Sequence, residues 1–267
     1  MIKKSYIFFS LIIVLFLIFS FPRIGGSQGV VILNYHQIVD DNPSNQAEIN
    51  VDDFAAHMKY LYENNYRVLS LEELRDFYHQ ETFPERSVMI TFDDGYRSFY
   101  TKVFPILQEY DFNAVIFPIV SHISRITPKI LWMEPLKFSD IRDMAKNSDI
   151  IEVGSHTYDL HYYTGENQPA VMQKPEETKN EYIKRIDQDL RVSKDLLEVQ
   201  IEKDVEALAW PFGITTEKVK NIALNNSFKY LFTIVPEKFT SEHCLTQIPR
   251  FPVESGCQKH FKEILND

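Results

Sequence analysis

The sequence predicts an α/β protein whose mostly parallel sheet closes into an irregular (β/α) barrel of about seven units. Strand-like and helix-like segments alternate along the chain from residue 29 onward, a pattern typical of a parallel sheet covered by helices. No internal repeat and no long Pro-, Gly- or Ser-rich linker divides residues 29–267, so we expect a single domain. An open doubly wound sheet is the alternative, although no Gly-rich dinucleotide loop follows the first predicted strand.

Taken in order, the predicted strands are short runs of apolar, β-branched and aromatic residues. They cover residues 30–35, 67–70, 87–92, 114–120, 150–155, 205–210, 230–235 and 248–253. The predicted helices repeat apolar residues at helical spacing, as Ile183, Ile186 and Leu190 do in the longest one. They cover residues 51–65, 71–79, 96–110, 139–146, 176–199, 216–226 and 260–265, and a polar loop over 162–175 precedes the longest helix.

Residues 1–28 predict a signal peptide or an N-terminal membrane anchor. Lys3 and Lys4 precede an apolar or small run from Tyr6 to Phe21, and Gly25-Gly26-Ser27 follows it. The charged start and the small-residue exit are typical of a secretory signal, and the run is at the short end for a membrane span. We therefore expect an exported protein that is secreted, held at the cell surface or attached to the membrane. Cleavage of the segment is left open.

The charge balance argues against a nucleic-acid partner. The whole chain has a formal net charge of −10, and residues 29–267 combine 25 bases with 38 acids, or about −13. Phosphate backbones require a basic surface, whereas a neutral or cationic polymer would be tolerated. Cys244 and Cys257 are the only two cysteines. Outside the cell they could form a disulfide, which the sequence alone does not establish.

The residues suited to chemistry follow the predicted strands. Ser87–Phe92 runs directly into Asp93, Asp94 and Gly95, and two adjacent carboxylates are costly unless a cation lies between them or one binds a proton. An ordinary solvated turn is the alternative. Three other predicted strand ends carry polar or turn-forming clusters, namely Tyr35-His36, Gly154 to His161, and Trp210-Pro211-Phe212-Gly213. In parallel α/β folds such residues gather at one edge of the sheet.

A carboxylate of the Asp93-Asp94 pair could share a divalent metal with His156 and His161. One carboxylate and two imidazoles leave positions open on the ion, as in hydrolytic sites that activate water. The two histidines are five residues apart, so one helix face would not present both. Alone, either histidine would be an ordinary loop residue; beside two carboxylates, the metal-site interpretation is favoured.

These motifs resemble those of the polysaccharide deacetylases, the NodB-like carbohydrate esterases. Thr91-Phe92-Asp93-Asp94-Gly95 resembles their first motif. Residues 155–161 resemble the second, with one residue more between the histidines than the usual H-[S/T]-x-x-H. The longer spacing, Tyr35-His36, Trp210 to Gly213 and Ile248-Pro249-Arg250 together resemble the branch that deacetylates poly-β-1,6-N-acetylglucosamine, a biofilm adhesin of bacteria.

The resemblance implies a role for each site residue. Asp94, His156 and His161 would bind a divalent metal, with zinc the expected ion, and Asp93 would be the general base that activates the attacking water. The backbone N–H at Phe212 would help to hold the oxyanion. His36 would be the general acid that protonates the departing amine, in place of the C-terminal histidine of the wider family.

The chain departs from the wider family near the base. Ala209 stands where the family has an arginine that orients the base, and no C-terminal Leu-x-His motif is present. Arg250 is expected at the substrate-binding site, where it could supply the missing charge; a structural ion pair is the alternative. Among the aromatic residues near the motifs, Tyr35 and Trp132 are taken as sugar contacts, and Tyr162-Tyr163 is a weaker candidate.

The expected function is therefore metal-dependent removal of N-acetyl groups from an extracellular poly-β-1,6-N-acetyl-D-glucosamine. Deacetylation of peptidoglycan or chitin-type β-1,4 oligomers is an alternative, because the residues do not distinguish the linkage. A catalytically silent carbohydrate-binding protein is another, although the complete Asp-Asp-His-His set argues against it. A metal-dependent phosphoesterase would need basic phosphate ligands or a second metal cluster, and the sequence suggests neither.

Overall fold

The computed structural model of the chain describes residues 29–124, 134–255 and 258–266. Its strands are β1 (Val31–Tyr35), β2 (Gln37–Val39), β3 (Glu48–Asn50), β4 (Arg67–Val68), β5 (Ser87–Asp94), β6 (Ala114–Pro118), β7 (Ile151–Val153), β8 (Tyr163–Thr164), β9 (Gln168–Pro169), β10 (Ala207–Ala209), β11 (Tyr230–Phe232) and β12 (Phe251–Pro252). Its α-helices are α1 (Val51–Glu63), α2 (Leu71–His79), α3 (Phe104–Tyr110), α4 (Val120–Ser124), α5 (Phe138–Asn147), α6 (Lys179–Ile201), α7 (Glu217–Asn225) and α8 (Gln258–Asn266). Short helical turns cover η1 (Phe99–Val103), η2 (Gly165–Asn167) and η3 (Pro211–Gly213).

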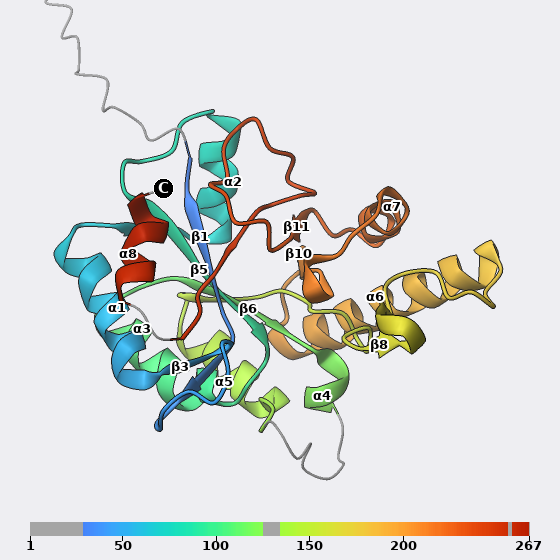
Figure 1. The fold of residues 1–267 in the computed structure, drawn as a ribbon, viewed down its shortest axis with the longest axis horizontal. Coiled ribbons are helices and arrows are strands. Elements are labelled where there is room, and N and C mark those ends of the chain that lie inside the picture. The colour runs from blue at the N-terminus through green and yellow to red at the C-terminus, as the bar shows by residue number, and fades with distance from the viewer. Residues whose placement is uncertain (1–28, 125–133, 256–257, 267) are drawn as a thin grey trace, which may run out of the picture.

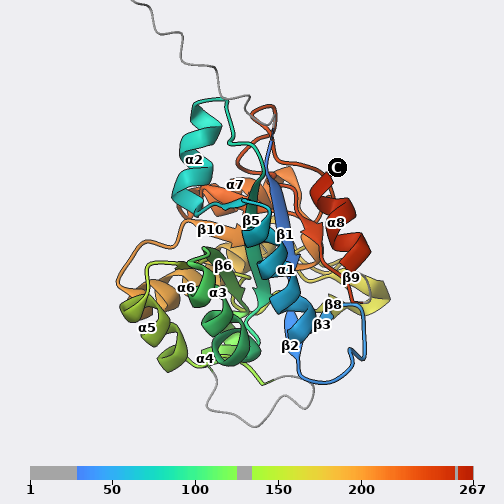
Figure 2. The same cartoon turned by 90° about the vertical axis from the view of Figure 1, so that its left-hand side faces the viewer.

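The prediction of an α/β fold with a parallel sheet is confirmed. A six-stranded parallel sheet has the order β12-β1-β5-β6-β7, with β4 also paired to β5. Figure 1 shows β1, β5 and β6 at the centre with helices around them, and in Figures 1 and 2 the C-terminal α8 lies beside α1. The ladder places the carboxyl ends of β1 and β5 side by side, since Tyr35 is in register with Phe92.

The predicted barrel closure stays a prediction. β10 and β11 form a separate two-stranded parallel sheet. Isolated parallel bridges connect its strands to flanking segments, Leu208 to Ser155 on one side and Phe232 to Ile248 on the other. Among the described residues, the regular strand ladders therefore do not form one closed wall.

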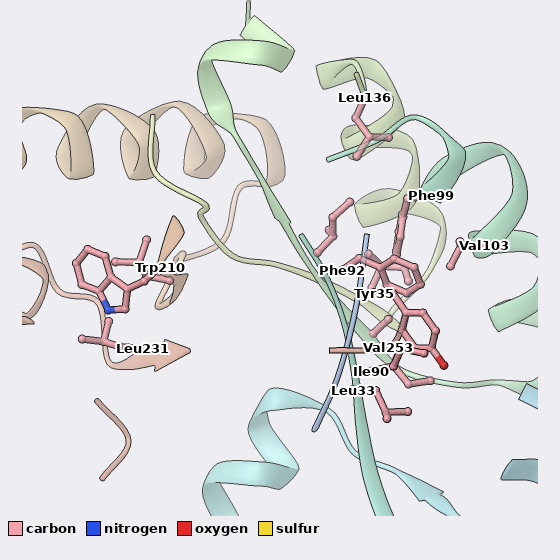
Figure 3. Close-up of a cluster of buried hydrophobic side chains, with 14 of the residues drawn as sticks. Leu33, Tyr35, Ile90, Phe92, Phe99, Val103, Leu136, Trp210, Leu231 and Val253 are labelled. Carbon is pink, nitrogen blue, oxygen red and sulfur yellow. The ribbon is translucent and has the colours of Figure 1, made fainter. Parts of the chain in front are cut away.

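Side-chain alternation along the central strands separates two apolar clusters. Val31, Leu33 and Tyr35 of β1 belong to the larger cluster between sheet and helices, whereas Ile32 points to the other face. Figure 3 shows part of the larger cluster. Because successive side chains of a strand point to opposite faces, Asn34 continues the face of Ile32. On β5 the same period places Met89, Thr91 and Asp93 on that face.

Helix boundaries follow local capping chemistry. The predicted helix 71–79 matches α2, whose capping box joins the Ser70 hydroxyl to the Glu73 N–H and the Glu73 carboxylate to the Ser70 N–H. The longest helix begins at Lys179 rather than at the predicted residue 176, because Thr178 and Glu181 form another capping box. Capping side chains thus set these starts more sharply than apolar periodicity does.

Four local features differ from the sequence prediction. The parallel pair β2–β3 lies where no strand was expected, and the loop predicted over 162–175 contains the antiparallel pair β8–β9. The segment predicted as a helix over 96–110 contains the π-helical turn η1 followed by α3. A short helix, α4, follows β6. These elements are too short to show a clear hydrophobic period.

Several predictions concern residues outside the described part of the chain. They are the signal or anchor over residues 1–28, the sugar contact at Trp132 and the Cys257 half of a Cys244–Cys257 disulfide. Within the described ranges, no helix is both long enough and apolar enough to cross a membrane.

Candidate active site

Asp94, His156 and His161 come together at the carboxyl ends of β5 and β7. One donor atom from each lies within 4.8 Å of the other two. Asp94 Oδ1 is 3.6 Å from His156 Nε2 and 3.5 Å from His161 Nε2. Asp94 and His156 are buried and His161 is half-buried. Two imidazole nitrogens and a carboxylate oxygen converging on one point form the donor set of a three-residue metal site.

The hydrogen bonds around this triad fit a cation. Asp94 Oδ1 is buried and accepts no hydrogen bond from the described residues, although buried carboxylates are normally satisfied. His156 Nδ1 lies 2.9 Å from the carbonyl oxygen of Ala209. Since a carbonyl can only accept, Nδ1 bears the hydrogen and Nε2 offers its lone pair to the triad. The residues present therefore suit a divalent metal.

Burial governs the protonation of the triad. Burial raises the pKa of Asp94 to about 6, and the charge of Asp93 adds to this effect while His36 opposes it. Burial lowers the pKa of His156 to about 3 and also lowers the pKa of His161. The imidazoles are thus neutral at pH 7, the state in which they can coordinate a metal.

Asp93 lies in a network of buried polar groups. Arg250, which has no exposed surface, holds it with two parallel bonds, Nη1 to Oδ1 at 2.8 Å and Nη2 to Oδ2 at 2.7 Å. Asn34 Nδ2 donates to Asp93 Oδ2 at 3.2 Å, and Arg250 Nη1 also reaches Asn34 Oδ1 and Thr91 Oγ1 at 3.1 Å each. Arg250 Nε donates to the carbonyl of Thr233. This network fixes the carboxylate plane of Asp93.

The two adjacent aspartates consequently differ in pKa. Burial alone would raise the pKa of Asp93, but the charge and hydrogen bonds of Arg250, with His156, hold that pKa well below its usual range. Asp94 lacks such a partner, so its pKa is raised. Environments that separate the pKa values of neighbouring carboxyls are typical of active sites.

Three residues of the site adopt left-handed backbone conformations that favour glycine. Asp94 has φ of 70°, Thr157 of 71° and Phe212 of 58°. Such conformations cost about 1–3 kcal/mol each in residues with a Cβ, and they persist where the surrounding structure imposes them. Gly95 follows with φ of 78°, and a Cβ there would lie 2.7 Å from Pro118 Cβ. The backbone near the triad is therefore strained at Asp94, Thr157 and Phe212.

Asp189 of α6 supports the loop between the two histidines. Its two carboxylate oxygens accept the backbone N–H groups of Tyr158 at 2.8 Å and Asp159 at 2.9 Å. Ser121 of α4 donates through its hydroxyl to Asp159 Oδ1 and through its backbone N–H to the carbonyl of Tyr158. These bonds hold the longer inter-histidine loop from both sides.

The other predicted site residues are placed as follows. His36 follows β1, is half-buried, and its charge affects the pKa values of both Asp93 and Asp94. The ring of Phe212 lies 4.4 Å from that of His161. Tyr35 is fully buried, stacks on Phe92 at 5.2 Å and bonds to His57 through its hydroxyl. It is a core residue with no surface for a sugar, which corrects the predicted substrate contact.

Arg250 is also placed differently from the substrate contact expected for it. Its guanidinium is completely buried against Asp93, so it cannot touch a polymer at the surface. The position agrees instead with the suggested replacement for the arginine missing at Ala209. Asn34 and Asp189 were not predicted as site residues, and Thr91 was named only as part of the first motif. A polar Asn34 inside an apolar strand was the available signal for the first of them.

Comparisons with known proteins agree with this geometry. The family described as polysaccharide deacetylase matches residues 80–231. Poly-β-1,6-N-acetyl-D-glucosamine N-deacetylase of Escherichia coli strain K12 is 30% identical over 232 residues, covering 75% of this chain and 34% of the relative. The chain thus spans about a third of that relative. The protein of the same name from Staphylococcus aureus strain MSSA476 is 26% identical over 241 residues, covering 85% of this chain and 80% of the relative.

Solved structures share the fold. The BpsB deacetylase domain from Bordetella bronchiseptica is 26% identical with a TM-score of 0.72, over 85% of this chain and 96% of that domain. IcaB from Ammonifex degensii is 23% identical with a TM-score of 0.76, over 90% of this chain and 97% of the other. At 23% identity, the similarity to IcaB concerns the fold alone.

Proposed function

Because this chain belongs to the polysaccharide deacetylase family, we propose that it removes N-acetyl groups from extracellular poly-β-1,6-N-acetyl-D-glucosamine in a metal-dependent hydrolysis. One observation carries the proposal. Three metal-ligating side chains, Asp94, His156 and His161, converge beside a second carboxylate, Asp93, that an arginine keeps ionised. The polymer is suggested by the names of the relatives in Escherichia coli and Staphylococcus aureus.

Asp94, His156 and His161 would hold the metal, with zinc the ion that this donor set favours. A divalent cation in such a site supplies Lewis acidity, which polarises an acetamide carbonyl and favours ionisation of water. The chain's own part is to keep both imidazoles neutral and oriented, which the Ala209 carbonyl does for His156. The unsatisfied Asp94 Oδ1 supplies the negative ligand.

Asp93 is proposed as the general base that takes a proton from the attacking water. Arg250 and Asn34 donate hydrogen bonds to its carboxylate and fix its orientation. A base so held is ionised at pH 7 and loses little entropy on reaching its working geometry. His36 is proposed as the acid that protonates the departing amine, and the backbone N–H of Phe212 as an oxyanion donor.

The proposal includes two features of the whole chain. Residues 1–28 would act as a signal peptide or membrane anchor and bring residues 29–267 out of the cytoplasm. The larger sheet and the β10–β11 pair, which is bridged to flanking segments at Ser155–Leu208 and Phe232–Ile248, would form an irregular (β/α) barrel with the site at one end.

The direct test is acetate release from poly-β-1,6-N-acetyl-D-glucosamine and from chitin oligomers. The protein is first stripped with a chelator and then assayed with and without added zinc. We expect zinc-restored release from the β-1,6 polymer. Release from β-1,4 oligomers alone would support metal-dependent deacetylation and contradict the proposed β-1,6 substrate. No release from either polymer by the metal-loaded protein would favour a catalytically silent carbohydrate-binding protein.

Variants separate the roles of the two adjacent aspartates and the ligands. Asp93→Asn should abolish acetate release while retaining bound zinc, and His156→Ala should lose both. His79→Ala changes an exposed histidine on α2 and serves as the matched control for metal content. Equal zinc loss in Asp93→Asn and His156→Ala would contradict the proposed division between base and ligand.

A further inference from the structure

An aromatic stack leads from the metal triad to the protein surface. The ring of Phe212 lies 4.4 Å from His161 on one side and 4.3 Å from Tyr163 on the other, with an angle of 29° between the Phe212 and Tyr163 planes. Tyr163, at the outer end, is 50% exposed. A large aromatic side chain that is half-exposed and continuous with a metal centre suggests a ligand surface.

The hairpin that carries Tyr163 is fixed in place. β8 and β9 pair Tyr163 with Pro169 and Thr164 with Gln168. Thr164 Oγ1 donates to the Gln168 carbonyl at 2.9 Å, and the N–H of Ala170 donates to the Tyr162 carbonyl at 2.9 Å. Ala170 is itself fully buried in the core. Tyr163 therefore presents its ring in a defined place, so little entropy would be lost when a ligand packs on it.

A hollow of about 550 Å³ adjoins the same hairpin on the face of Thr164 and Gln168, opposite the face that carries Tyr163. Its polar groups include Thr164, Gln168, Lys174 and Glu176. One basic and one acidic side chain balance each other, and hydroxyl, amide and charged groups can bond to ligand hydroxyls. The volume lies in the range of pockets that hold small ligands. These groups suit a neutral, hydroxyl-rich ligand.

We propose that Tyr163 forms a sugar subsite beside the metal centre, on which the pyranose ring of an N-acetylglucosamine residue next to the reacting one packs. The hollow at Thr164 and Gln168 would receive the hydroxyls of a sugar further along the polymer. The inference rests on the proposed function for its ligand, because a polymer with one acetamide at the triad must place its neighbouring sugars along the adjacent surface. It makes Tyr163 a residue that favours polymer over monosaccharide.

The test measures oligosaccharide affinity and metal affinity separately. Zinc-loaded protein in the Asp93→Asn background, which prevents turnover, is titrated calorimetrically with β-1,6-linked N-acetylglucosamine oligomers. Tyr163→Ala should weaken oligomer binding about three- to tenfold, from the loss of one aromatic contact, and leave zinc affinity unchanged. Tyr163→Phe keeps the ring and should stay within about twofold of the parent.

Tyr62→Ala is the matched control, because Tyr62 on α1 is also exposed and also pairs with another ring, that of Tyr110. Equal oligomer affinity in Tyr163→Ala and Tyr62→Ala would overturn the subsite, while acetate release by the unaltered protein would still support the proposed function. Binding that depends on Tyr163, without release by the unaltered protein, would overturn the function and retain the subsite. Zinc loss in Tyr163→Ala, or no oligomer binding by any variant, would overturn the subsite.

Discussion

Replacing Arg250 with methionine should destabilise the protein by about 3–5 kcal/mol at pH 7. The substitution keeps an apolar side chain of similar length but removes the counter-charge of Asp93, which is only 3% exposed. It also removes the donors that reach Thr233, Asn34 and Thr91. The larger part of the loss comes from leaving an ionised carboxylate buried without its partner.

The loss should depend on pH in a defined direction. In the unaltered protein Arg250 holds the pKa of Asp93 below its unfolded value, so the resulting stability is present above that value and lost only as pH falls through the lower folded pKa. In Arg250→Met, burial dominates and raises the pKa of Asp93 above its unfolded value. The variant should then gain stability relative to the parent as pH falls from 7 towards 4.

The assay is urea unfolding of metal-free protein, followed through the fluorescence of the buried Trp210. Arg191→Met, at an exposed arginine of α6, is the control and should change stability by less than about 0.5 kcal/mol. The double variant Asp93→Asn/Arg250→Met removes the orphaned charge and should be more stable than Arg250→Met alone. A loss below about 1 kcal/mol, or a double variant no more stable than Arg250→Met, would refute the reasoning.

Three further outcomes are expected. Asp189→Asn should weaken zinc binding about tenfold in a calorimetric titration, because one of the two loop N–H groups loses its acceptor; unchanged affinity would mean that the loop needs no such support. Burial raises the pKa of Asp189 to about 6, so its contribution to stability should fall as pH rises from 4 to 6, and urea unfolding of Asp189→Asn should lack this part of the slope. Gly95→Ala should lower the free energy of unfolding by about 2–4 kcal/mol, through its positive φ and the clash with Pro118, and a loss under about 1 kcal/mol would contradict this.

Local pattern was sufficient for most secondary structure. The run over residues 87–92 predicted the central strand, and the helix predicted over residues 71–79 matches α2, whose capping box joins Ser70 and Glu73. These features depend on side-chain alternation and on hydrogen bonds between near neighbours, so a few consecutive residues are enough to predict them. The β8–β9 hairpin was missed because two-residue strands have no period to recognise.

The sequence by itself determined the α/β fold and the strand ends at which Asp94, His156 and His161 lie, because residue type and spacing carry that information directly. Only the tertiary structure decided that Arg250 pairs with Asp93, 157 positions away, that Tyr35 faces the core, and that Tyr163 extends the ring stack from His161. These facts depend on which face of each strand meets which neighbour. That choice is made by strand register and packing across the whole chain, where a shift of one residue would turn Asn34 and Asp93 away from Arg250.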